Sequence, residues 1–156
     1  MSSSAMFFDA IKQLFLTKLP LSRELDVQVE ELNEARALVR MPYDAQFAGD
    51  PDSGALHGSF IAALLDTTLG MAVLARLNQE RAIATVDLRI DYLNPSQRDH
   101  DLLIESECYR LTKNLAFGRG RAYHDTPTRE IASAASTFII GAPQSSQINL
   151  KKPVVP

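Results

Sequence analysis

Apolar residues occur at helical spacing near the start of the chain and at strand spacing further on. Large apolar side chains at i, i+3, i+4 and i+7 predict an amphipathic helix over residues 5–18, which Pro20 ends. Residues 25–32 and 35–41 then alternate between apolar and polar positions, which predicts two strands joined by a tight turn. Residues 42–55 are rich in Pro, Gly, Asp and Ser and are predicted to form a loop.

Residues 56–75 are apolar on nearly every side of a helix, and such a helix is normally buried. Asp66 lies near its middle. Because an unpaired buried charge is too costly to retain, this carboxylate must be hydrated, paired or protonated. The segment begins with His57, Gly58 and Ser59, a start that exposes free backbone N–H groups where negative charge is favoured. One helix thus offers an oxyanion site at its start and a base or nucleophile at its middle.

Three or four long strands follow, over residues 82–93, 101–111, 115–124 and 130–140. In the first of them we expect one face to carry Ala82, Ala84, Val86, Leu88, Ile90 and Tyr92, and the other to carry Ile83, Thr85, Asp87, Arg89 and Asp91. An antiparallel sheet that accompanies a single apolar helix buries that helix by wrapping around it. The sequence therefore predicts an α+β hotdog fold, an antiparallel sheet wrapped around one long central helix.

Length and charge narrow the class of protein. We expect one domain over residues 1–141, with the helix at 5–18 included, and a mobile tail over residues 142–156. The formal net charge is −3 without a basic block, which argues against nucleic acid and against an anionic membrane as partners. A signal-peptide pattern is not seen at the N-terminus. Cys108 is the single cysteine, which excludes an internal disulfide and favours a reducing, cytoplasmic location.

Metal and cofactor chemistry is not indicated. His57, His100 and His124 are scattered, without the spacing of a metal site, and the chain has no Gly-rich phosphate loop. We therefore expect neither metal nor cofactor. The chain also lacks a Gly-x-Ser-x-Gly elbow, so Ser59 is not expected to act as a serine-hydrolase nucleophile.

The start of the central helix carries a resemblance to a known family. Leu56-His57-Gly58-Ser59 followed by Leu65-Asp66 resembles the His-Gly-Gly…Asp signature of PaaI-like hotdog-fold acyl-CoA thioesterases. The likeness covers about residues 24–141, and its further similar segments are residues 84–95, 110–117 and 132–139. Two positions depart from the family pattern. Ser59 stands where the second glycine is expected, and Pro51 stands where some members carry Asn.

The resemblance implies hydrolysis of an acyl-CoA at a site between the subunits of a homodimer, which often pairs again into a homotetramer. It implies that Asp66 is the catalytic carboxylate, that it acts opposite the Gly58 N–H of the other subunit, and that Thr85 holds the water. The chemistry of the residues agrees, since a developing oxyanion needs a donor and the carbonyl carbon needs a base or a nucleophile. Whether Asp66 is base or nucleophile stays open. His57 is expected to shape the turn that presents Gly58, with capping, water orientation and packing as alternatives.

Substrate contacts are less sharply defined by the sequence. Ser59 adds a hydroxyl at the predicted site, and Lys113 with Asn114 lies in a turn where coenzyme A phosphates could bind. Weaker phosphate candidates are Arg98, Arg119 and Arg121, and candidates for the acyl pocket are Phe60, Leu64, Met71 and Leu111.

Three alternatives remain open at this point. One is a hotdog protein that binds acyl-CoA without turning it over, although such proteins usually carry an effector domain. Another is a hotdog hydratase or dehydratase, which generally needs a paired acid and histidine. His57 and Asp66 are nine residues apart on one predicted helix and would not touch within a subunit. In the third, the protein is a scaffold and Asp66 is only structural.

Overall fold

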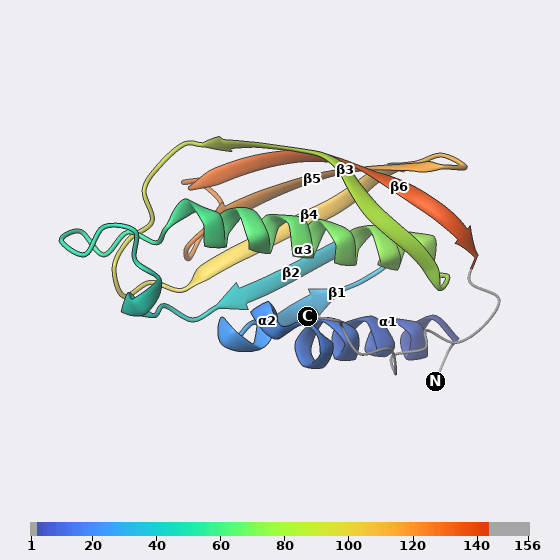
Figure 1. Ribbon diagram of the computed structural model, residues 1–156, viewed down its shortest axis with the longest axis horizontal. Coiled ribbons are helices and arrows are strands. Elements are labelled where there is room, and N and C mark those ends of the chain that lie inside the picture. Colours follow the sequence, from blue (N-terminus) through green and yellow to red (C-terminus); the bar gives the residue numbers. More distant parts are fainter. Residues whose placement is uncertain (1–2, 144–156) are drawn as a thin grey trace, which may run out of the picture.

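A single antiparallel sheet wraps around one long helix in the computed structural model, which describes residues 3–143 (Figure 1). The sheet order is β1-β2-β4-β5-β6-β3. The strands are β1 (Gln28–Leu32), β2 (Arg36–Met41), β3 (Arg81–Tyr92), β4 (Leu102–Leu111), β5 (Leu115–Tyr123) and β6 (Ala132–Pro143). The helices are α1 (Ser3–Gln13), α2 (Pro20–Glu24) and α3 (Gly58–Leu77), with a π-helical turn η1 (Leu14–Lys18) and a 3-10 turn η2 (Ala45–Phe47). The predicted hotdog fold is confirmed. Of the tail predicted over residues 142–156, residues 142 and 143 belong to β6, and residues 144–156 lie outside the described part of the chain.

Helix α3 lies close to the sheet because small residues face it from β5. A Cβ on Gly118 would come within 2.8 Å of Leu69 Cδ2, and one on Gly120 within 3.2 Å of Leu65 Cδ2. The helix ends at Asn78, which takes the left-handed conformation common at C-caps. By length and hydropathy alone α3 is able to cross a bilayer, but most of its apolar window is buried inside the domain. Its role here is that of a core helix.

The N-terminal segment departs from the single helix predicted over residues 5–18. α1 ends at Gln13, a π-helical turn continues to Lys18, and α2 then starts at Pro20. Proline is well suited to the first position of a helix, because its missing N–H has no partner there in any case. Pro20 therefore ends one helix and also begins the next, which the sequence prediction missed.

Strand β1 is shorter than predicted. It begins at Gln28 rather than at residue 25, because Asp26 takes a positive φ of 49° that breaks the extended backbone. Leu25 and Val27 are nevertheless buried in the core. The alternation of apolar residues therefore predicted which side chains are buried, although these residues do not belong to a strand.

Strand β3 changes face partway along, which corrects the predicted alternation. The register with β6 shifts between Thr85 and Asp87, so Val86 forms a bulge and is 61% exposed. Before the bulge the odd-numbered Ile83 packs on the core, and after it the even-numbered Leu88 and Ile90 do. The prediction that all even-numbered residues share one face was therefore wrong for Ala82, Ala84 and Val86. The bulge lets Thr85 face α3 while Ile83, Leu88 and Ile90 stay packed on the core.

Candidate active site

The start of α3 is capped by an imidazole. His57 is the N-cap residue, and its Nδ1 accepts the N–H of Ser59 at 3.1 Å. The Ser59 hydroxyl lies 2.7 Å from the same nitrogen. The His57 N–H in turn donates to the Phe47 carbonyl at 2.9 Å, which ties the loop to the helix. His57 and Ser59 thus act together to form the turn that the sequence predicted around Gly58, and the hydroxyl of Ser59 is used in the cap.

Gly58 presents the first N–H of the helix. Among the residues that the structure describes, none accepts this N–H, as is usual for the first turn of a helix. The Gly58 carbonyl accepts the hydroxyl of Tyr92 at 3.0 Å. A Cβ at position 58 would lie 3.2 Å from the Tyr92 ring, so glycine is the residue that fits without displacing it. Sequence reasoning missed Tyr92, which a pattern of alternation cannot distinguish from other strand residues.

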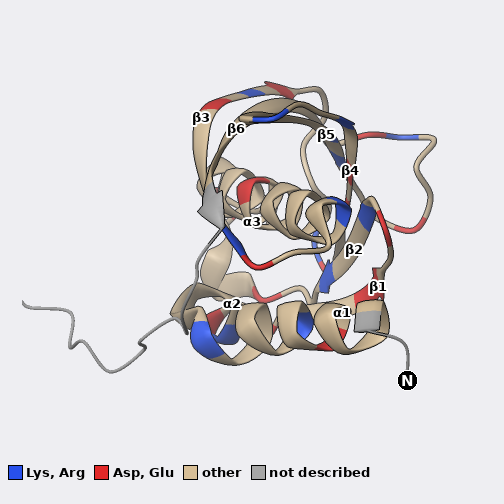
Figure 2. Ribbon diagram, turned by 90° about the vertical axis from the view of Figure 1, so that its right-hand side faces the viewer, with Lys and Arg blue, Asp and Glu red and all other residues tan. Residues whose placement is uncertain are grey.

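Asp66 is paired with Thr85. The carboxylate lies half-buried at the middle of α3, and its Oδ1 accepts the Thr85 hydroxyl at 2.8 Å. It is the one acidic residue in the sequence of α3, and Figure 2 shows a single acidic position on that helix. The structure therefore brings together two residues that the sequence proposed separately. The hydrogen bond also explains how a carboxylate is kept in an apolar helix.

Gly58 and Asp66 do not meet within one chain. They are eight residues apart on the same helix, which corresponds to about 12 Å along its axis. A reacting carbonyl group must lie about 3 Å from both the donor and the attacking group. The two groups of one chain therefore cannot act on the same carbonyl.

The other predicted substrate contacts lie elsewhere. Lys113 and Asn114 occupy the turn between β4 and β5, toward the opposite end of the molecule from the His57 turn (Figure 1). The Asn114 carbonyl accepts the N–H of Ile140 at 2.8 Å. Arg98 donates to the carbonyls of Pro51 and Asp52 at 2.8 and 2.9 Å, so its guanidinium fixes the loop before α3. Pro51, which stands where some family members carry Asn, thus takes part through its backbone carbonyl, which accepts a hydrogen bond from Arg98.

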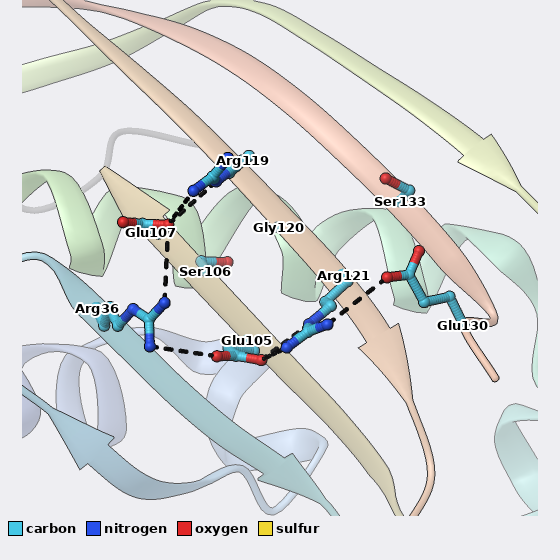
Figure 3. Close-up of a pocket in the computed structure, with 9 residues that line it drawn as sticks. All are labelled: Arg36, Glu105, Ser106, Glu107, Arg119, Gly120, Arg121, Glu130 and Ser133. Carbon is cyan, nitrogen blue, oxygen red and sulfur yellow. Dashed lines mark hydrogen bonds and ion pairs between the residues drawn. The ribbon is translucent and has the colours of Figure 1, made fainter. Parts of the chain in front are cut away.

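Arg119 and Arg121 belong to an ion-pair ladder on the outer face of the sheet (Figure 3). Arg119 donates to Glu107 at 2.8 Å, and Arg121 donates to Glu105 at 2.7 Å. The Glu105 carboxylate raises the pKa of Arg121 further. These groups line a hollow of about 310 Å³, on the opposite face of the sheet from α3. Because the charges satisfy one another and lie away from Asp66, this hollow is not the place for thioester chemistry.

The predicted acyl-pocket residues mostly belong to the core. Leu64 and Met71 are each 1% exposed and pack inside the domain. Phe60 packs against Phe47 with ring centroids 4.9 Å apart and the ring planes tilted by 60°, beside the His57 cap. Leu111 packs half-buried against the core. Within residues 3–143, no group of three or more metal-ligating side chains comes together.

A six-stranded antiparallel sheet wrapped around one long helix is the hotdog fold. The chain belongs to the thioesterase superfamily, whose family model matches residues 53–131, and it is a thioester hydrolase. A medium/long-chain acyl-CoA thioesterase, YigI of Salmonella typhimurium, is 26% identical over 144 residues, covering 84% of this chain and 92% of that protein.

Solved structures share the fold. A protein from Pseudomonas aeruginosa is 36% identical, with a TM-score of 0.75 over 85% of this chain and 98% of its own. A thioesterase protein from Streptococcus pneumoniae, solved with coenzyme A, has a TM-score of 0.67 at 18% identity over 76% of this chain and 88% of its own, and shows the shared fold.

Proposed function

We propose that this protein hydrolyses acyl-CoA thioesters at a site that two chains of a homodimer complete together. The observation that carries the proposal is the hydrogen bond from Thr85 to Asp66 on a helix whose first N–H, at Gly58, has no acceptor among the described residues. The names of a curated relative and of a structural relative, an acyl-CoA thioesterase and a thioesterase solved with coenzyme A, support this substrate class.

In the proposed reaction the thioester carbonyl accepts the N–H of the partner's Gly58. Asp66 either takes a proton from a water molecule that attacks the carbonyl carbon, or attacks that carbon itself and is released by water. The C–S bond breaks, and the thiolate of coenzyme A takes up a proton. The products are the free acid and coenzyme A, with one water consumed. Thr85 holds one carboxylate oxygen and leaves the other for the reaction.

The separation of Gly58 from Asp66 supports the dimer. Since about 12 Å of helix separates them within one chain, a second chain must supply one of the two groups. Strand β3, twelve residues long, is an edge strand of the sheet. Among residues 3–143 it pairs with β6 on one side only, and Val86 and Tyr92 are exposed on it. Edge strands of this length readily pair with another chain.

The register of this pairing follows from the site. Along β3, Thr85 lies beside Asp66 of α3, and Tyr92 lies beside Gly58 at the start of α3. An antiparallel β3–β3 pairing that sets Thr85 opposite the partner's Tyr92 brings Asp66 to the level of the partner's Gly58. Because Val86 is an extra residue in the bulge, the same pairing sets Leu88 opposite the partner's Ile90. The two-fold axis then passes through Arg89, and the dimer holds two equivalent sites.

The first test is release of free thiol from a panel of acyl-CoAs, with wild type beside Asp66→Asn. The variant should lose at least about 100-fold in kcat, as expected when a general base or nucleophile is removed. Asp9→Asn, which changes an exposed carboxylate on α1, serves as the matched control and should keep wild-type activity. Full activity in Asp66→Asn would contradict the mechanism, and saturable binding without thiol release would indicate a binding protein instead.

The second test asks whether the site is shared. Asp66→Asn and Gly58→Pro, which removes the N–H, should each be inactive as homodimers. When the two are co-expressed, each mixed dimer regains one intact site, so about a quarter of wild-type activity should return for random pairing. Mixed dimers without activity would show that both groups act within one chain.

A further inference from the structure

A second cavity lies between the N-terminal helix and the far end of α3. Its volume is about 640 Å³, within the range of ligand sites in proteins. The walls include the apolar side chains of Phe7, Ile11 and Leu14 from α1 and η1, and of Leu74 from α3. Polar side chains, among them Lys18 and Glu80, also border it. An apolar interior with polar groups at its border suits a hydrocarbon chain better than it suits a charged ligand.

The cavity is aligned with Asp66 along the seam between α3 and β3. Three pairs of residues follow one another along this seam. Asp66 contacts Thr85, a Cβ on Gly70 would lie 3.8 Å from Ile83 Cδ1, and Leu74 and Arg81 both line the cavity. The helix members are four residues apart and the strand members two apart, so both rows advance by about 6 Å per step.

On the helix side, the middle of this seam is Gly70, which has no side chain, and Ile83 and Phe138 lie across from it. Gly70 is in a helix interior, where glycine costs about 1 kcal/mol relative to alanine. A methyl group there would meet only ordinary contacts, so packing does not demand glycine at this position. The guanidinium of Arg81 is held by the Gly141 carbonyl, with its Nε at 2.8 Å, which fixes it at the β6 side of the cavity.

We propose that this cavity receives the distal end of the acyl chain, so that the enzyme prefers long acyl groups. The inference rests on the proposed function, since it places the thioester carbonyl beside Asp66. From Asp66 to Leu74 the helix rises about 12 Å. An extended chain advances about 1.2 Å per bond, so about ten carbons are needed before the chain enters the cavity. Shorter acyl groups end in the seam between α3 and β3 and gain no binding energy from the cavity.

A π-helical turn in the cavity wall is consistent with a binding role. η1 supplies Leu14, Thr17 and Lys18 to the lining. Such turns are rare, and those that occur in proteins are often at functional sites. Here the turn directly follows α1 and ends two residues before Pro20, the first residue of α2.

The test measures kcat/KM for saturated acyl-CoAs from four to sixteen carbons with wild type, Ala10→Trp and Met6→Trp. Ala10 is an exposed residue that lines the cavity, so an indole there fills it without disturbing the core. Met6 is 63% exposed, lies one turn earlier on α1 and does not line the cavity. Met6→Trp therefore adds the same bulk outside the cavity and serves as the control. Each methylene that leaves water should raise kcat/KM about three- to fourfold.

For wild type and Met6→Trp we expect kcat/KM to rise at least about tenfold between ten and fourteen carbons, since each added methylene then enters the cavity. Ala10→Trp should lose this rise and keep wild-type kcat/KM on butyryl-CoA. A flat wild-type profile, an unchanged profile in Ala10→Trp, or an equal loss at every chain length would overturn the proposal. Hydrolysis of butyryl-CoA with any of these results would leave the proposed function intact, whereas no hydrolysis of any acyl-CoA would reject that function itself.

Discussion

Thr85 donates its hydroxyl hydrogen to Oδ1 of Asp66 at 2.8 Å and thereby links the edge strand to the central helix. Within residues 3–143, no donor contacts the other carboxylate oxygen, Oδ2. One oxygen is therefore fixed in place and the other is available for a water molecule or a carbonyl carbon. This arrangement gives Thr85 a positioning role.

Removing the Thr85 hydroxyl should lower kcat. Thr85→Val keeps the shape of the side chain and deletes the hydrogen bond, and a bond to a charged group is worth about 1.5–3 kcal/mol, so kcat should fall roughly tenfold to a hundredfold. Thr85→Ser restores the donor and should stay within about threefold of wild type. Steady-state kinetics on one acyl-CoA would check both. Equal activity in the Val and Ser variants would show that the hydroxyl does not position Asp66.

The contact between Gly58 and Tyr92 predicts a coupled effect. Gly58→Ala places a methyl group 3.2 Å from the Tyr92 ring, so the ring or the helix start must move and kcat/KM should fall. Tyr92→Leu removes the ring and should make the Gly58→Ala change less harmful. A double-mutant cycle on kcat/KM measures this coupling, expected at about 0.5–3 kcal/mol for residues in contact. Strict additivity would mean that the methyl group acts through something other than Tyr92.

Packing beneath α3 predicts the stability of two glycine variants. A Cβ on Gly120 would lie 2.9 Å from Ser106 Oγ, so Gly120→Ala should destabilise the fold by about 1–3 kcal/mol. Adding Ser106→Ala removes the closest atom and should recover part of this loss. Gly70→Ala meets its nearest neighbour at 3.8 Å and should stabilise α3 by up to about 1 kcal/mol. Chemical denaturation of the three variants checks the order of their stabilities. A Gly120→Ala variant as stable as wild type would show that the neighbouring strands move apart at little cost.

Cys108 should be unreactive in the folded protein. Burial raises the pKa of its thiol, and the thiolate is the reactive form. Iodoacetamide at pH 8 should therefore label the unfolded chain far faster than the folded one, as mass spectrometry would show. Since the unfolded thiol ionises near pH 8.5 while the folded thiol stays protonated, the free energy of unfolding should decrease as pH rises above that value. Fast labelling of the native protein would contradict the buried environment.

The fold was predictable because its signals are strong and local. The apolar run over residues 56–75 gave the central helix within two residues at either end of the observed Gly58–Leu77. The alternating strands after it gave a sheet that must cover that helix. The pattern could not predict the bulge at Val86. A bulge is an irregularity in the pairing of two strands, and it cannot be recognised from the alternation of residues in one of them.

The candidate site was predictable in part. Asp66 stood out because a charge in an apolar helix needs an explanation, and Gly58 because it opens that helix. Tyr92 did not stand out, since its hydrogen bond to Gly58 joins residues 34 positions apart in sequence. Leu64 and Met71 were two of four candidates for an acyl pocket and are buried in the core of the chain, because hydrophobicity alone does not tell which side of a helix faces an opening.

The distance of about 12 Å between Gly58 and Asp66 on one helix also has a kinetic consequence. If neither chain holds a whole site, activity per chain depends on protein concentration and falls on dilution below the Kd of the dimer. Restoring the concentration should return activity in a second-order reaction, at the rate at which chains find one another. An excess of the Asp66→Asn chain would then not inhibit, because each wild-type chain has one working site in a mixed dimer, as it has in the wild-type dimer. On dilution the added chain would instead keep wild-type chains paired and preserve their activity.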